Sequence, residues 1–147
     1  MKITTIEKLS EENQALVRLA MESRKHAYSP YSSHLVGAAV RSKEGNTYGG
    51  CNIEIITLQM SAHAERNAVM NMAMHGDRVI DALVCYGPYS GVPCAECRQV
   101  IWEFCDNNPD VLIIGATTEG EIELMTIGEI YPYPYGPTTK GIDCKKY

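Results

Sequence analysis

The chain has 147 residues, of which 45% are hydrophobic and 21% are charged, a composition typical of one soluble globular domain spanning residues 1–147. Its 13 Lys and Arg against 18 Asp and Glu give a formal net charge of −5, which would repel a phosphate backbone, so polymeric nucleic acid is not an expected partner. The sequence contains no stretch that approaches the roughly 18 apolar residues needed to span a membrane, and the charged segment 1–20 is unlike a signal peptide, so we expect no membrane association and a cytoplasmic location.

The expected elements begin with a helix over 6–28, where apolar residues recur at helical spacing between charged positions. The apolar segments 35–42 and 47–53 predict a β-hairpin that turns at "KEGN". Pro93 suits the start of the helix that we expect to follow it. The later elements are expected to be a helix over 61–75, a strand over 79–86, a helix over 94–105, strands over 111–117 and 121–125, a helix over 126–130 and an irregular tail "YPYPYGP".

This order of helices and strands predicts an α/β fold. It contains five strands, with a hairpin first and βα units after it, which favours a mixed five-stranded sheet with helices on both faces.

Six cysteines need an explanation in a reducing compartment, where metal ligation or burial is more common than disulfide formation. Cys94 and Cys97 form a C-x-x-C pair at an expected helix start, so their sulfurs lie on one face and can share one ion. Catalytic zinc needs a third protein ligand and an open position for water, and His63, at another expected helix start, can supply that ligand. Cys51, Cys85 and Cys105 lie in apolar segments and are expected to be buried thiols.

Glu65 lies two residues after His63 and gives the proposed centre a catalytic acid and base. Zinc lowers the pKa of a bound water from 15.7 to about 7, and a neighbouring carboxylate can accept the proton and deliver it elsewhere. The combined pattern H-x-E…P-C-x-x-C is typical of zinc deaminases.

Two other readings of the cysteines stay open. Cys94 and Cys97 could form a redox pair, although such pairs usually follow the first strand of a thioredoxin-like fold and this pair comes late. A zinc-stabilised binding module is the third reading, but structural sites usually have four protein ligands and this chain offers three plus a glutamate.

Five stretches in order carry a resemblance to the cytidine deaminase family, from about residue 27 to 137: "AYSPYSSHLVGAAV", "GGCNIE", "HAERNAV", "PCAECRQV" and "EIYPYPYGP". The resemblance implies a three-layer α/β/α domain with one Zn²⁺ per subunit. It also implies hydrolysis of cytidine and deoxycytidine to uridine and deoxyuridine, in pyrimidine salvage.

The resemblance also implies roles for single residues. Asn52 and Glu54 would hydrogen-bond a ribose hydroxyl, and Glu65 would protonate the ring nitrogen and then the leaving amine. The Ala64 N–H would bind the base carbonyl, and the Val92 carbonyl would accept from the amino group. Tyr135 would be the aromatic residue of the tail that contacts the substrate. Arg66 and Arg98 would either hydrogen-bond the zinc thiolates or form surface salt bridges.

Four positions depart from the family pattern. His34 stands where the family usually has a phenylalanine that contacts the base or sugar, which would make His34 a substrate contact. Ile55, Val92 and Ala95 replace a usual asparagine, serine and glycine. A modified cytosine nucleoside, as in blasticidin S deaminases, is therefore the alternative substrate, although those enzymes lack the pair kept here at Asn52 and Glu54.

Assembly is the last expectation. Short family members with three cysteine ligands are typically homotetramers, whereas a His-Cys-Cys site resembles the longer dimeric members. The longer class carries an additional domain that 147 residues cannot hold, so we expect a homotetramer rather than a homodimer.

Overall fold

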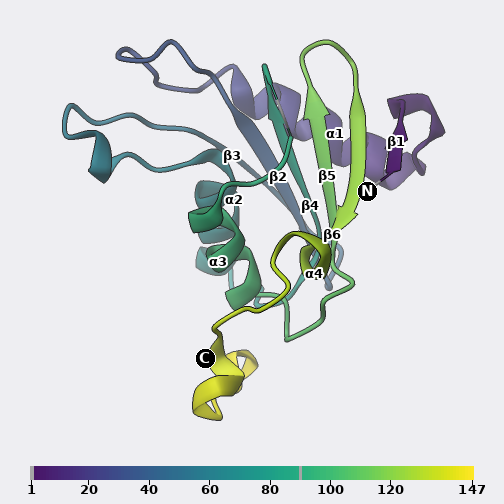
Figure 1. Cartoon of the computed structure of the whole chain (residues 1–147), viewed down its shortest axis with the longest axis vertical. Coiled ribbons are helices and arrows are strands. Elements are labelled where there is room, and N and C mark those ends of the chain that lie inside the picture. The colour runs from purple at the N-terminus through teal and green to yellow at the C-terminus, as the bar shows by residue number, and fades with distance from the viewer. Residues whose placement is uncertain (1, 90) are drawn as a thin grey trace.

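A mixed sheet forms the centre of the computed structural model, which describes residues 2–89 and 91–147 (Figure 1). Within these residues the sheet has six strands in the order β1-β6-β5-β4-β2-β3, and β4 and β5 are its parallel pair. The strands are β1 (Lys2–Thr4), β2 (Gly37–Ser42), β3 (Thr47–Cys51), β4 (Ile80–Gly87), β5 (Leu112–Thr117) and β6 (Ile122–Thr126).

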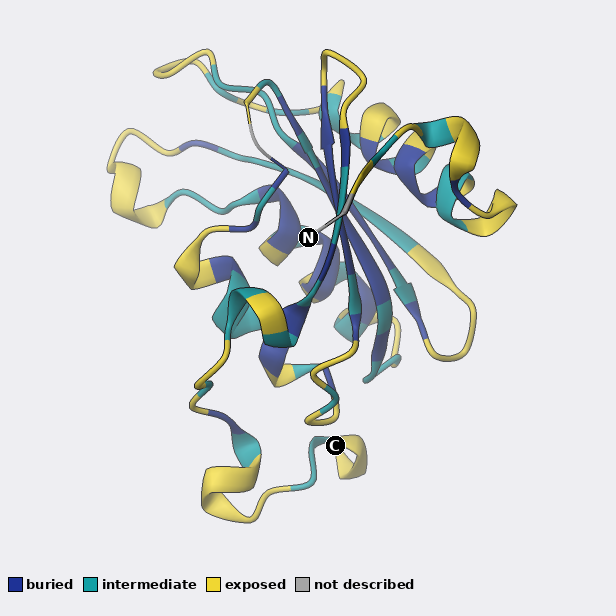
Figure 2. Ribbon diagram, turned by 45° about the vertical axis from the view of Figure 1, so that its right-hand side comes forward, coloured by how far each residue is buried: buried dark blue, intermediate teal, exposed yellow. Residues whose placement is uncertain are grey.

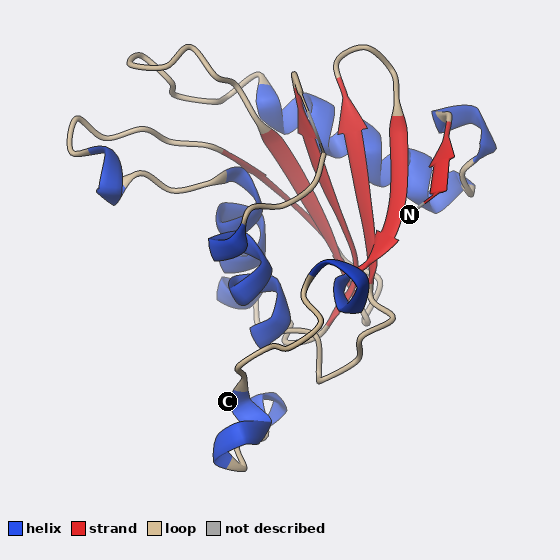
Figure 3. Cartoon of the chain, in the orientation of Figure 1, coloured by secondary structure: helices blue, strands red, loops and turns tan. Residues whose placement is uncertain are grey.

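Helices cover both faces of the sheet, as Figure 3 shows. Helix α1 packs on one face, and α2, α3 and α4 pack on the other. The helices are α1 (Glu11–Arg24), α2 (Ala64–Met74), α3 (Ala95–Glu103) and α4 (Ile127–Ile130), with short 3₁₀ helices at Ile6–Lys8, Leu58–Met60, Pro137–Lys140 and Cys144–Lys146. The expected α/β fold with helices on both faces is confirmed.

Apolar runs in the central strands follow from this layering. Successive side chains of a strand point to opposite faces, so a strand that is covered on both sides needs apolar residues throughout. On β4, Leu83 packs toward α2 and α3, and Val84 packs toward α1. Ile113 and Ile114 divide in the same way on β5. Figure 2 shows the resulting buried centre between exposed loops.

Two features of the first thirty residues differ from expectation. The sheet has six strands rather than five, because Lys2–Thr4 pairs with β6 as a three-residue edge strand too short to leave an alternating pattern. Helix α1 begins only at Glu11, because Ser10 caps it and accepts from the Asn13 N–H at 3.4 Å. Among the described residues, the helices include none that is long and apolar enough to cross a membrane.

The loop between β4 and α3 lies directly on β5. A side chain at Gly91 would place its Cβ 2.1 Å from the Gly115 Cα, so this close backbone contact requires a glycine. The contact holds Gly91, three residues before Cys94, against β5. The starts of α2 and α3 thereby meet beside the carboxyl end of β4, the edge where α/β sheets bind ligands.

Candidate metal centre and adjoining cavity

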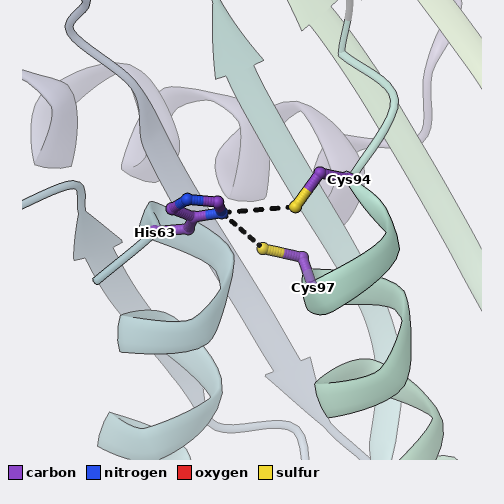
Figure 4. Close-up of side chains that lie close together, drawn as sticks. All are labelled: His63, Cys94 and Cys97. Carbon is purple, nitrogen blue, oxygen red and sulfur yellow. Dashed lines mark hydrogen bonds between the residues drawn. The ribbon is translucent and has the colours of Figure 1, made fainter. Parts of the chain in front are cut away.

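Three side chains with metal-ligand chemistry converge where α2 and α3 begin (Figure 4). The His63 Nδ1 lies 3.2 Å from the Cys94 Sγ and 3.4 Å from the Cys97 Sγ. All three candidate ligand atoms lie within 4.8 Å of one another. Residues 31 and 34 positions apart in the sequence therefore meet at one point in the fold.

The spacing of these atoms fits a zinc ion. Tetrahedral zinc with its usual bonds to nitrogen and sulfur places those two ligand atoms roughly 3.5 Å apart. The two nitrogen-to-sulfur distances, 3.2 and 3.4 Å, agree with that value. Three protein ligands leave the fourth position of a tetrahedral site for water, as catalytic zinc requires.

His63 occupies the position immediately before α2, where Ser, Thr, Asp or Asn usually caps the first N–H groups. Its side chain makes no capping hydrogen bond and instead faces the two sulfurs. Cys94 precedes α3 in the same way and also makes no side-chain cap. Both residues thus direct their side chains toward each other rather than toward their own helices.

Cys97 lies fully buried on the first turn of α3. Burial, reinforced by the nearby Glu65 carboxylate, raises the pKa of its thiol. A thiol of raised pKa becomes a thiolate when it binds a cation, because a metal ligand must be deprotonated.

A cavity of about 490 Å³ adjoins the three ligands. Its lining includes His63 and Cys94, and Glu65 reaches it from the first turn of α2 with only 5% of its surface exposed. The size suits a small molecule, and a buried carboxylate beside candidate metal ligands is a suitable acid and base.

Asn52 and Glu54 line the same cavity and also hold the preceding loop in place. The Asn52 amide accepts from the Val36 N–H at 2.8 Å and donates to the His34 carbonyl at 2.7 Å. Glu54 accepts from the backbone N–H groups of Tyr31 and Ser32, at 2.9 and 3.2 Å, and from the Ser32 hydroxyl. Each side chain keeps some hydrogen-bonding capacity for a ligand.

The hydrogen bonds to Glu54, led by that from the Ser32 hydroxyl, lower its pKa to about 2 from an ordinary 4.5. A lowered folded-state pKa stabilises the fold above the unfolded value, and this stabilisation disappears as the pH falls toward 2. We expect Glu54→Gln to be less stable than the wild type near neutral pH, and the difference to shrink as the pH falls from 4.5 toward 2. Urea unfolding of both proteins across this range measures the difference.

Glu119→Gln, on the exposed turn between β5 and β6, is the matched control and should show a smaller, pH-insensitive change. A constant gap between Glu54→Gln and the wild type would contradict the role of the Glu54 charge.

The other expected substrate contacts divide into two groups. His34, Ala64 and Val92 line the cavity. Among the residues described, the lining does not include Tyr135, which is 59% exposed and whose carbonyl accepts from the Gln99 side chain at 2.9 Å.

Arg66 and Arg98 flank the metal centre. Arg66 forms an exposed salt bridge of 3.0 Å with Glu96 between α2 and α3. Arg98 donates to the Pro93 carbonyl at 2.7 Å and to the Ile130 carbonyl at 2.9 Å. These contacts support the segment that carries Cys94, and bonds from either arginine to the sulfurs stay a prediction.

Cys85 and Tyr89 are cavity residues that were not among the expected contacts. Cys85 was expected only as a buried thiol; it is buried, yet it lines the cavity next to Glu65. Tyr89 lies on the loop after β4 and also lines the cavity. The sequence did hold a signal for Cys85, since the carboxyl end of a central strand forms part of the ligand-binding edge of α/β sheets.

The sequence of this chain is similar to those of known proteins. Residues 10–112 match the family model of the "Cytidine and deoxycytidylate deaminase zinc-binding region". A cytidine deaminase of Sporosarcina psychrophila is 37% identical over 123 residues, covering 81% of this chain and 88% of that protein. One from Halalkalibacterium halodurans is 34% identical, covering 82% and 92%.

A solved structure agrees as well. The crystal structure of cytidine deaminase from Burkholderia pseudomallei matches with a TM-score of 0.79 at 28% identity, covering 86% of this chain and 100% of that one. The matched family region contains both helix starts that carry His63 and Cys94.

Proposed function

The chain belongs to the family of cytidine and deoxycytidylate deaminases, and on that premise we propose how its residues carry out the zinc-dependent hydrolysis of cytidine and deoxycytidine to uridine, deoxyuridine and ammonia. The observation that carries the proposal is the meeting of His63, Cys94 and Cys97 beside a cavity that also contains the buried Glu65.

His63, Cys94 and Cys97 would hold the zinc ion of this zinc-binding domain. Zinc bound there supplies a water molecule whose pKa is lowered toward about 7, a nucleophile at neutral pH. The Arg98 hydrogen bond to the Pro93 carbonyl holds the backbone immediately before Cys94 and so keeps that sulfur in position.

Glu65 would move the protons of the reaction. Its carboxylate accepts a proton from the attacking water and donates it to the ring nitrogen N3, and it then transfers the second proton to the amine. The C4–O bond forms and the C4–N bond breaks, so one water is consumed and one ammonia leaves. The burial of Glu65 keeps bulk water away from this transfer.

Backbone groups would orient the base. Ala64 is the first residue of α2, and N–H groups of the first helical turn have no acceptor within the helix, so the Ala64 N–H can donate to the base carbonyl. The Val92 carbonyl would accept from the amino group. Because both contacts use backbone atoms, the unusual valine at position 92 leaves them intact.

Asn52 and Glu54 would bind a sugar hydroxyl with the hydrogen-bonding capacity that the loop leaves them. The cavity lining, within the described residues, contains acidic Glu54 and Glu65 but no Lys or Arg. A 5′-phosphate would therefore meet negative charge without a cation to bind it. This favours nucleosides over nucleotides.

Ammonia release by the zinc-loaded protein tests the proposal on cytidine, deoxycytidine, cytosine, cytidine monophosphate and blasticidin S. We expect efficient turnover of cytidine and deoxycytidine and poor turnover of the monophosphate. Turnover of blasticidin S alone would instead favour the modified-cytosine alternative. Turnover of none of the five would refute the substrate assignment.

Assembly as a homotetramer of single-domain chains, residues 1–147, is part of the proposal. Segment 52–62 extends away from the sheet (Figure 1). It exposes a group of large apolar side chains that a second chain could cover: Ile55, Ile56, Leu58 and Met60. Light scattering should give four times the mass of one chain, and a mass of one or two chains would contradict it.

A cytoplasmic location and a role in pyrimidine salvage complete the proposal. All six cysteines are free thiols, which suits a reducing compartment. Hydrolysis of free nucleosides returns uridine and deoxyuridine to the pyrimidine pool. Fractionation of the source cells tests the location.

A further inference from the structure

Two aromatic rings from different loops stack over the cavity. His34, between α1 and β2, and Tyr89, after β4, have ring centroids 5.4 Å apart and planes 11° from parallel. Both residues line the cavity, and Tyr89 is 81% exposed, so the pair lies at the opening rather than in the floor. We call this pair, His34 and Tyr89, the aromatic clasp.

The His34 half of the clasp is fixed to the floor of the cavity. The His34 N–H donates to the Ser32 hydroxyl at 3.0 Å, and its carbonyl accepts from Asn52. Ser32 in turn binds Glu54. The His34 half of the clasp is therefore tied directly to Asn52 and, through Ser32, to Glu54.

The Tyr89 half is attached through its loop to the sheet. The Thr118 N–H donates to the Gly87 carbonyl at 3.0 Å, two residues before Tyr89. Gly91, two residues after it, packs against the Gly115 backbone. Most of the surface of Tyr89 is exposed to solvent. A large aromatic side chain gains free energy when it is covered.

The position of the base determines which part of the nucleoside lies beneath the clasp. If C4 of the base reaches the end that contains His63, Cys94 and Glu65, the sugar lies at the Asn52 and Glu54 end, beneath the clasp. We propose that Tyr89, stacked on His34, packs against the sugar of the bound nucleoside and is a further binding contact for it. This inference rests on the proposed function, and it adds to it a residue that the sugar-binding pair does not include.

The chemistry of the clasp predicts which bound substrates it stabilises. Aromatic faces contact the carbon atoms of a sugar and do not read a single hydroxyl. The contact should therefore contribute equally to cytidine and deoxycytidine. It should act on binding rather than on proton transfer, because proton transfer is assigned to Glu65.

Steady-state kinetics of Tyr89→Ala on both nucleosides test the proposal. We expect KM to rise roughly two- to tenfold, the range for loss of one aromatic contact, with kcat changed less than about twofold. Tyr89→Phe should behave as the wild type, because the ring remains. Tyr133→Ala, at a tyrosine that is 95% exposed and outside the cavity lining, is the matched control and should be silent.

A double-mutant cycle with His34→Ala tests whether the two rings act together. The KM of the double variant should rise less than the product of the two single effects. An unchanged or lowered KM in Tyr89→Ala, or a loss confined to kcat, would overturn the proposal while leaving the deaminase assignment in place. A wild type that fails to deaminate cytidine would overturn both.

Discussion

Glu65→Gln is expected to lower kcat for cytidine by roughly 10²- to 10⁴-fold, the contribution typical of general acid and base catalysis. Glutamine matches the shape of Glu65 but cannot accept and return a proton. KM should change far less than kcat, because the proposed sugar contacts and the backbone contacts to the base do not involve this carboxylate. Steady-state kinetics with a zinc determination on the same sample separate lost catalysis from lost metal.

Glu96→Gln supplies the control for this experiment. Glu96 lies on the first turn of α3, between the two cysteines, but its side chain is exposed and pairs with Arg66 outside the cavity. Its replacement should leave kcat nearly unchanged. A Glu65→Gln protein that keeps its zinc and retains kcat within about threefold of the wild type would exclude Glu65 as the acid and base.

Cys97→Ala is expected to abolish zinc binding and, with it, deamination. Removing a ligand should reduce zinc affinity by more than the roughly 10- to 100-fold that follows loss of a residue supporting a ligand. Elemental analysis of the purified protein should find one zinc per wild-type chain and almost none in the variant. His63→Ala should give the same result from the other helix.

Cys105→Ala is the matched control, because this fully buried thiol follows α3 and donates to the Ile101 carbonyl at 3.1 Å, away from the three ligands. The control should lose some stability but keep its zinc and its turnover. Full zinc content in Cys97→Ala would contradict the assigned ligand set.

The sequence predicted the architecture where hydrophobic pattern was strong. The apolar runs over 79–86 and 111–117 became β4 and β5, because strands covered on both faces must be apolar throughout. The strand over Lys2–Thr4 was not predicted, because three residues at a sheet edge carry no periodicity and depend on pairing with β6. Likewise, the apolar spacing over 6–28 could not show that Ser10 interrupts it.

The residues of the candidate site were likewise only partly predictable from the sequence. His63, Glu65, Cys94 and Cys97 could be named from sequence because their chemistry requires fixed residue types at helix starts. Tyr89 could not, because a tyrosine in a Gly- and Pro-rich loop is informative only once the fold brings it against His34. Ser32 could not either, since its bond to Glu54 joins segments 22 residues apart.

The bonds that Asn52 and Glu54 make to segment 31–36 limit how this enzyme could be redesigned. A substitution meant to accept a different sugar would also release the loop that presents His34. On the proposed assignment, sugar binding and loop architecture thus depend on the same two side chains. An engineer seeking an altered substrate range would do better to begin at Tyr89, whose exposed ring can be exchanged without dismantling that support.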